Sequence, residues 1–276
     1  MRRLVLLSSL ALLACGTGEK KAADSSSAAA PAQNWVTIMA QEFTFDAPDT
    51  LPAGFTRVNL MNHGAEPHHI LFARLDSGHV LGELLQELGA NKIPTWVSWL
   101  GGPNAAMPGA TTETVVELTP GNYAVLCVIP TADGTPHVAK GMVRPLTVKA
   151  ATAATIPPTP DVDLTLTDYT FSVDKPITVG PHVIRVQNQA EQPHELVLVR
   201  LEPGKTVQEF AKWIEKPQGP PLGAVIGGTS PQSKGVTNYV MADFSPGSYG
   251  FICFLPDAKD GKPHLVHGMI NQFKVN

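Results

Sequence analysis

Two segments of the chain carry the same metal-binding side chains in the same order. Residues 121–142 read GNYAVLCVIPTADGTPHVAKGM and residues 247–269 read GSYGFICFLPDAKDGKPHLVHGM, so each has a Cys, a later His, and a Met after four further residues. Upstream, each copy has an Asn followed six residues later by a His, and the residue directly before that His is a Pro. The candidate ligands are His68, Cys127, His137 and Met142 in one copy, and His194, Cys253, His264 and Met269 in the other.

Two imidazoles, one thiolate and one thioether are the ligands of a copper site that transfers single electrons, because soft sulfur donors favour copper over hard cations. The offset between the copies is 126 residues for the Asn, the first His and the Cys, and 127 for the second His and the Met. The second copy therefore has one more residue than the first in its Cys–His loop. Two sets in register predict copper as the cofactor, type 1 in kind and up to two ions per chain.

The motif Gly-x-Tyr-x-(aliphatic or aromatic)-x-Cys, followed by His-x4-Met, resembles the cupredoxin, or blue-copper, family. It occurs in both copies, so the resemblance covers nearly all of the chain after its N-terminal segment. It implies a copper-binding electron-transfer protein whose sites cycle between Cu(II) and Cu(I). The Cys–His loops are longer than in small members such as plastocyanin and are more similar to those of two-domain copper nitrite reductases.

Two departures from the family bear on function. Multicopper reductases and oxidases have a His directly before the Cys, for a second copper site, where this chain has Leu126 and Ile252. Because these imidazoles are absent, we expect the chain not to be an enzyme. The residue after the upstream His is Asn in many cupredoxins but His69 or Glu195 here, which puts the redox potential of each site in doubt.

Other interpretations of these residues stay open. A copper-sequestering or delivery lipoprotein would carry the same ligands, and in a metal-free cupredoxin-like binding module the Cys and Met would only pack. His69 and His267 flank predicted ligands and could replace one of them. A disulfide between Cys127 and Cys253 would need Cα atoms within about 7 Å, which equivalent core positions of two complete domains rarely meet.

The elements that must position these ligands are short strands. The chain has 25 prolines and 24 glycines, which suit strands joined by turns. Alternation of apolar and polar residues begins each copy, at 35–45 and 162–171. The pattern predicts an all-β fold of two tandem Greek-key β-sandwich domains of the cupredoxin-like kind, each with a short helical insertion, at 79–89 and 206–216. The Gly-Gly segments that begin at Gly101 and Gly227 are predicted to be loops.

The predicted organisation begins with a lipoprotein signal peptide at 1–14 and a flexible tether at 15–34. A first domain at 35–149, a linker at 150–160 and a second domain at 161–276 follow. Arg2 and Arg3 precede a short apolar run, and Leu-Leu-Ala-Cys, ending at Cys15, resembles a bacterial lipobox. We therefore expect lipidation of Cys15 and a lipid-anchored location in the bacterial cell envelope, on the periplasmic or outer-membrane side.

The charge of the chain indicates which kinds of partner to expect. The formal net charge is −4, and no cluster of basic residues indicates nucleic-acid binding. We expect redox partner proteins of the cell envelope, and the membrane itself through the lipid on Cys15. The sequence identifies no small-molecule substrate.

Overall fold

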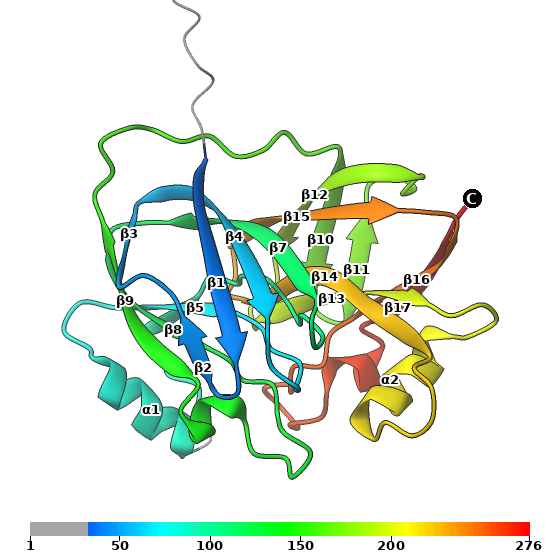
Figure 1. The fold of residues 1–276 in the computed structure, drawn as a ribbon, viewed down its shortest axis with the longest axis horizontal. Coiled ribbons are helices and arrows are strands. Elements are labelled where there is room, and N and C mark those ends of the chain that lie inside the picture. The colour runs from blue at the N-terminus through cyan, green and yellow to red at the C-terminus, as the bar shows by residue number, and fades with distance from the viewer. Residues whose placement is uncertain (1–32, 91) are drawn as a thin grey trace, which may run out of the picture. The chain divides into compact units, whose positions relative to one another are not determined.

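A computed structural model describes residues 33–90 and 92–276 and folds them into two β-sandwiches, each with one helix (Figure 1). This confirms the predicted all-β class, the tandem sandwiches and the helical insertion in each. The first sandwich consists of β1 (Asn34–Gln41), β2 (Thr44–Asp46), β3 (Thr50–Pro52), β4 (Gly54–Asn62), β5 (Leu71–Leu75), α1 (Leu81–Gly89), β6 (Val97–Trp99), β7 (Thr111–Leu118), β8 (Gly121–Leu126), the single-turn helix η1 (His137–Lys140) and β9 (Val143–Lys149).

The second sandwich repeats this order after a connection, residues 150–161, that has neither helix nor strand. It consists of β10 (Val162–Thr167), β11 (Thr170–Val173), β12 (Gly180–Asn188), β13 (His194–Leu201), α2 (Val207–Glu215), β14 (Gly223–Gln232), β15 (Thr237–Phe244), β16 (Gly247–Ile252), η2 (His264–His267) and β17 (Ile270–Val275). The predicted signal peptide, Cys15 and nearly all of the predicted tether lie outside the described residues.

One sheet runs through both sandwiches. Its eight strands follow the order β11-β10-β12-β15-β7-β4-β1-β2, and the join is an antiparallel pairing of β7 with β15. A five-stranded sheet (β3-β9-β8-β5-β6) completes the first sandwich, and a four-stranded sheet (β14-β13-β16-β17) completes the second. The duplicated halves are therefore hydrogen-bonded to each other, which the sequence did not predict.

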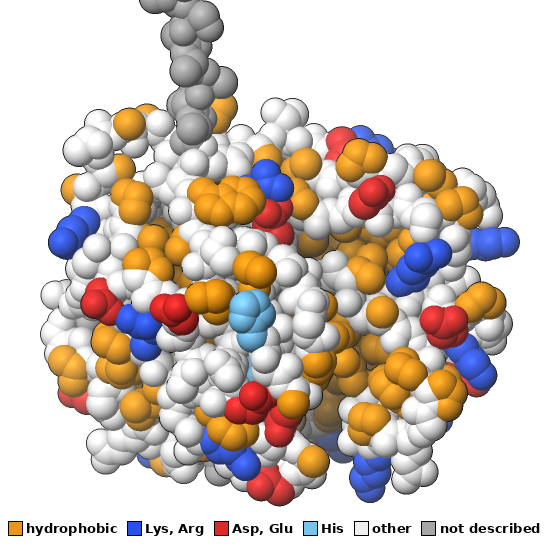
Figure 2. Space-filling model, in the orientation of Figure 1, with side chains coloured by type: hydrophobic (Ala, Val, Ile, Leu, Met, Phe, Trp, Pro, Cys, Tyr) orange, Lys and Arg blue, Asp and Glu red, His pale blue; other side chains and the backbone are white. Residues whose placement is uncertain are grey.

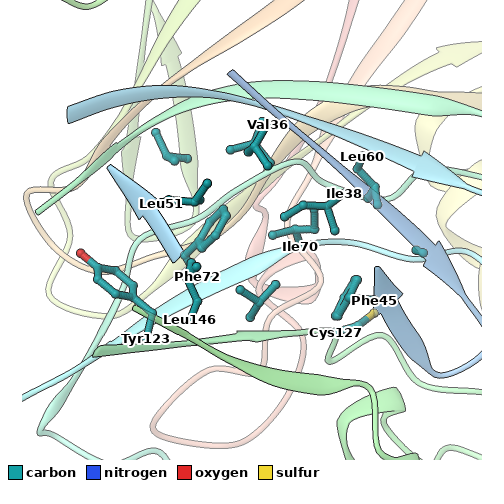
Figure 3. Packing of buried hydrophobic residues seen from close by; sticks show 14 of the residues in the cluster. Val36, Ile38, Phe45, Leu51, Leu60, Ile70, Phe72, Tyr123, Cys127 and Leu146 are labelled. Carbon is teal, nitrogen blue, oxygen red and sulfur yellow. The ribbon is translucent and has the colours of Figure 1, made fainter. Parts of the chain in front are cut away.

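The strand that leads to each Cys is buried on both faces. Tyr123, Val125 and Cys127 point into the cluster between the sheets, as their alternation predicts (Figure 3). Leu126 points the other way, into the cluster that also contains Leu84 of α1. The second sandwich is built in the same way, with Cys253 in its inner cluster and Ile252 against α2. The positions before the two cysteines are thus filled by aliphatic packing.

The Gly-Gly segments are the main difference from the predicted elements. The second belongs to strand β14, and its Gly228 has φ +126°. A Cβ there would lie 1.8 Å from the carbonyl oxygen of Leu196, so glycine permits the close approach of two backbones. At the equivalent Gly102 a Cβ would lie 2.4 Å from the carbonyl oxygen of Ile70. At both positions glycine therefore allows the backbones of two chain segments to lie in close contact.

Helix α2 begins with a reciprocal cap. The Thr206 hydroxyl accepts the Glu209 N–H at 3.2 Å, and the Glu209 carboxylate accepts the Thr206 N–H at 2.8 Å. Among the described residues no helix is long and apolar enough to cross a membrane. Acidic and basic side chains are interspersed on the face that Figure 2 shows.

Candidate metal centres

Three predicted ligands meet in the first sandwich. The Nδ1 atoms of His68 and His137 lie 3.1 Å apart, and the Cys127 sulfur lies 3.5 Å from Nδ1 of His137. All three side chains are fully buried. They reach this point from the loop after β4, from the end of β8 and from the first residue of η1.

The second sandwich brings together the equivalent residues. The Nδ1 atoms of His194 and His264 lie 2.9 Å apart, and the Cys253 sulfur lies 4.0 Å and 3.3 Å from them, respectively. These side chains are also fully buried. The sequence-predicted His and Cys residues therefore form two separate groups, one in each sandwich.

The spacing of the donors fits a metal ion. Bonds of about 2.0 Å to nitrogen and about 2.3 Å to sulfur, in a trigonal or tetrahedral arrangement, put donor atoms about 3.4–3.8 Å apart. The five distances given above lie within about half an ångström of that range, and all the ligand atoms of each group lie within 4.8 Å of one another. Two imidazoles and one thiolate with a nearby thioether are the donor set of type 1 copper. The cofactor that these residues fit is copper.

The outer nitrogens of the histidines have acceptors that select the correct tautomer. Nε2 of His137 lies 3.0 Å from the Glu66 carboxylate, Nε2 of His194 lies 3.1 Å from the Asp168 carboxylate, and Nε2 of His264 lies 3.2 Å from the Gln192 side-chain oxygen. These oxygens accept a hydrogen bond, so Nε2 carries the proton and Nδ1 presents its lone pair toward the thiol. Nε2 of His68 faces Glu42 at 3.8 Å, outside hydrogen-bond distance.

The sequence reasoning missed these acceptors, although the repeat contains a signal for them. Glu66 and Gln192 are separated by the same 126 residues as the ligands, and so are Glu42 and Asp168. Each pair occupies equivalent places around its centre. An alignment of the two copies would have singled out these positions as acid or amide in both.

Burial determines the protonation of the metal-free centres. It raises the pKa of the Cys127 thiol to about 12 and also raises the pKa of Cys253. Burial lowers the pKa of His68 and of His194, and together with the nearby His194 it lowers the pKa of His264 to about 4. These imidazoles are therefore neutral near pH 7 while the thiols keep their protons, so a metal ion that binds must displace a thiol proton.

The two Met residues that are predicted as ligands lie in the same buried clusters as the cysteines. Met142 is fully buried in the same cluster as Cys127, and its carbonyl accepts the Cys127 N–H at 3.2 Å. The single turn η1 ends at Gly141, whose left-handed φ of 102° reverses the chain directly before the Met. Met269 and Gly268 repeat this arrangement in the second sandwich. The His-x4-Met spacing is therefore one helical turn followed by a glycine reversal.

The Asn of each Asn-x5-His motif organises the loop that carries the first His. The Asn62 amide donates to the carbonyls of Glu66 and Ala106, at 2.7 Å and 2.8 Å, and its oxygen accepts the Gly64 N–H. Asn188 makes the equivalent bonds in the second copy. These residues fix the position of the ligand loop and do not belong to either ligand group.

His69 and Glu195, which directly follow the upstream histidines, each connect two ligand loops. Nε2 of His69 accepts the backbone N–H of Val128 at 2.9 Å, and the Glu195 carboxylate accepts that of Phe254 at 2.9 Å. Each donor directly follows the Cys. His69 is therefore occupied with the backbone and lies outside the first ligand group, and His267 lies in a different group, with Asp257 and Asp260.

No family model and no curated protein matches the sequence. Several solved structures are similar. A reduced auracyanin from Roseiflexus castenholzii matches with 21% identity and a TM-score of 0.32, covering 43% of this chain and 98% of that one. A multicopper oxidase matches with 15% identity and a TM-score of 0.26, covering 88% of both chains. A copper-containing nitrite reductase from Thermus scotoductus matches with 12% identity and a TM-score of 0.25, covering 89% of this chain and 62% of that one.

At these identities the likeness concerns the fold alone. The strands and the ligand groups themselves show a cupredoxin-like β-sandwich in each half of the chain. One expectation is corrected, because the matches that extend over both sandwiches are an oxidase and a reductase. They contradict the expectation that the chain is not an enzyme. The aliphatic residues before the cysteines are a departure within an architecture that enzymes also use, so they do not exclude catalysis.

Proposed function

We propose that the chain is a copper-binding electron-transfer protein with one type 1 centre in each sandwich. The observation that carries the proposal is the convergence of two Nδ1 atoms and one thiol in each half, with acceptors that hold the outer nitrogen protonated at three of the four histidines. Copper bound there would supply one-electron chemistry, between Cu(II) and Cu(I).

The surrounding protein suits this chemistry because it holds the ligands rigidly. In each centre one His lies at the end of the loop that the Asn fixes, and the other ligands come from the end of the Cys strand and the turn that follows it. The donor residues are fully buried, so water has little access to the metal. Ligands that cannot move much between oxidation states lower the reorganisation that electron transfer requires.

Aromatic rings shield the second His of each centre. The Phe43 ring lies 5.1 Å from the His137 ring, edge to face, and Tyr169, its equivalent in the second copy, lies 5.7 Å from His264. Both aromatic residues lie in the turn between the first two strands of their sandwich. They pack against imidazoles whose Nδ1 points inward.

Loading the purified protein with Cu(II) tests the proposal. We expect two copper ions per chain and an intense visible band from thiolate-to-copper charge transfer. Cys127→Ser and Cys253→Ser should each remove the part of the band that one copper ion contributes. The double variant should be colourless but should still unfold in a cooperative transition. A colourless wild-type protein that retains Cu(I) would instead indicate copper delivery, and no uptake at all would indicate a metal-free module.

We also propose that the protein acts at the bacterial cell envelope, anchored by a lipid on Cys15, with redox proteins of the envelope as its partners. The support is the basic and apolar segment before Cys15 and the lipobox-like Leu-Leu-Ala-Cys. In cells that express the full chain, the protein should fractionate with membranes and be released by detergent. Cys15→Ser should move it to the soluble fraction; an unchanged distribution would refute the anchor.

A further inference from the structure

The two sandwiches meet about a local two-fold axis. In the pairing of β7 with β15, Thr114 lies opposite Val240, and in the bridge between the Gly-Gly segments Pro103 lies opposite Thr229. Each of these residues faces its own equivalent, 126 positions along the chain. We call this contact between the two sandwiches, made by β7 with β15 and by the two Gly-Gly segments, the seam. It resembles the self-complementary interface of a two-fold dimer, in which every contact occurs twice.

One pair of contacts across the seam shows this symmetry at the metal centres. The Asn104 side chain donates to the Leu196 carbonyl at 3.1 Å, and the hydroxyl of Ser230, its equivalent, donates to the Ile70 carbonyl at 2.7 Å. Leu196 and Ile70 are themselves equivalent, two residues after His194 and His68. One side chain of each sandwich thus donates a hydrogen bond to a backbone carbonyl of the other, two residues after its first His.

The two contacts differ at the residue that directly follows the first His of each centre, which is Glu195 in one copy and His69 in the other. The Asn104 nitrogen also lies 3.0 Å from the Thr229 carbonyl and 3.3 Å from the Glu195 carboxylate, so its two N–H groups are shared among three acceptors. The other oxygen of Glu195 accepts the N–H of Phe254. On the opposite side, the Ser230 hydroxyl is bonded to Ile70, and Nδ1 of the buried His69 has no hydrogen-bond partner among residues 33–90 and 92–276. The second centre is therefore held across the seam by a side-chain contact that the first centre lacks in the described part of the chain.

The segment that carries Asn104 is also bonded to the first centre. The Ala106 N–H donates to the carbonyl of His68 at 2.8 Å, and the His68 N–H donates to the carbonyl of Ala106 at 3.1 Å. Residues 104–106 thus join the backbone of a ligand of the first centre to the carboxylate beside a ligand of the second. Glu195 directly follows His194, and Phe254 directly follows Cys253.

We propose that Asn104 is a positioning residue of the second copper centre, so that the first sandwich sets the properties of the second centre. Its amide holds the Glu195 carboxylate where it accepts the Phe254 N–H, which fixes the His194 strand against the Cys253 strand. This inference rests on the proposed copper function. The family's ligand positions do not contain this residue, because it comes from the other half of the chain.

The test uses chains that load one centre only. In a Cys127→Ser background, Asn104→Ala should lower the Cu(II) affinity of the second centre by about tenfold to a hundredfold and shift its charge-transfer band. Ser230→Ala is the matched control, since it removes the equivalent seam bond without touching Glu195, and it should leave the band unchanged. In a Cys253→Ser background, Asn104→Ala should leave the first centre's band unchanged.

A charge exchange separates positioning from a general loss of structure. Asn104→Asp places a second carboxylate against Glu195 and should weaken the second centre more than Asn104→Ala does. Adding Glu195→Gln returns an amide donor to the pair with the roles exchanged, so the double variant should recover most of the affinity. If Asn104→Ala does not fold, Asn104→Ser supplies the side chain that its counterpart already has.

A measurement without metal distinguishes failure of this inference from failure of the copper function. In the metal-free full chain, amide hydrogen exchange at Phe254 should be faster in Asn104→Ala and unchanged in Ser230→Ala. If the protein binds no copper but Phe254 responds in this way, the positioning role stands and the copper function fails. If neither the exchange at Phe254 nor the band of the second centre responds to Asn104→Ala, the inference is overturned.

Discussion

Copper binding to the second centre should release one proton per ion near neutral pH. In the variant that combines Cys127→Ser with Glu195→Gln, only the second centre retains its thiol. The carboxyl beside His194, whose pKa burial raises to about 7, is there replaced by an amide that does not titrate. Burial raises the pKa of Cys253, so the free thiol is protonated, while burial lowers the pKa of His194 and brings that of His264 to about 4. Both imidazoles are therefore neutral at pH 7, and the entering ion displaces the thiol proton alone.

The size of the effect follows from this count. Release of one proton makes the apparent affinity change about tenfold per pH unit, or about 1.4 kcal/mol. Between pH 6 and pH 8 the affinity of the second centre should rise about a hundredfold, and it should fall as the solution becomes more acidic. Competition with a chelator at several pH values measures the slope, and calorimetry in buffers of different ionisation enthalpy counts the protons directly.

Two results would refute this reasoning. An affinity that does not change with pH would mean that the thiol is already ionised in the metal-free protein. Release of two or three protons would mean that the imidazoles are charged, against the direction in which burial shifts them. Adding Cys253→Ser is the control, because it removes the group that loses the proton and should abolish both the release and the band.

Three further predictions concern the metal-free fold, each measured by chemical denaturation. Gly228→Ala puts a Cβ against a backbone carbonyl and should cost more than about 3 kcal/mol, while Gly235→Ala, also at positive φ but in open space, should cost about 1 kcal/mol. Tyr123→Phe, which removes the 2.8 Å bond from the hydroxyl to the Thr119 carbonyl, should cost about 1 kcal/mol. Burial raises the pKa of Glu195 from 4.5 to about 7, so stability should fall by about 3 kcal/mol as pH rises through this range, and Glu195→Gln should remove that dependence.

The meeting of the candidate His and Cys residues could be predicted because their pattern occurs twice and much of it is local. The Cys at the end of an alternating strand and the His-x4-Met turn are encoded within one short segment, so their spacing predicts their meeting. The same holds for the face of β8 that carries Tyr123 and Cys127, since alternation alone determines it. The helices were predicted for a similar reason, because apolar residues at helical spacing lie within one short segment; the structure adds the cap of Thr206 and Glu209.

The seam and the Nε2 acceptors could not be predicted from one copy, because they depend on which segments meet in the folded chain. Gly227-Gly228 resembles an ordinary flexible loop, and only the approach of β13 shows that glycine is needed for a close backbone contact. Glu66 and Asp168 resemble solvated acids until their carboxylates are found at the imidazoles. For the acceptors, the signal in the sequence is the comparison of one copy with the other.

The divergence of His69 and Glu195 predicts an order of potentials for the two centres. A nearby carboxylate stabilises the more highly charged Cu(II), and a bound cation favours the ionised form of Glu195, whereas burial keeps His69 neutral by lowering its pKa to about 3. The second centre should therefore have the lower potential, and electrons shared between the centres should settle on the first. Redox titration of Cys127→Ser and Cys253→Ser measures each centre alone. A higher potential at the second centre, or a Glu195→Gln variant in which the potential of the second centre does not rise, would contradict this order.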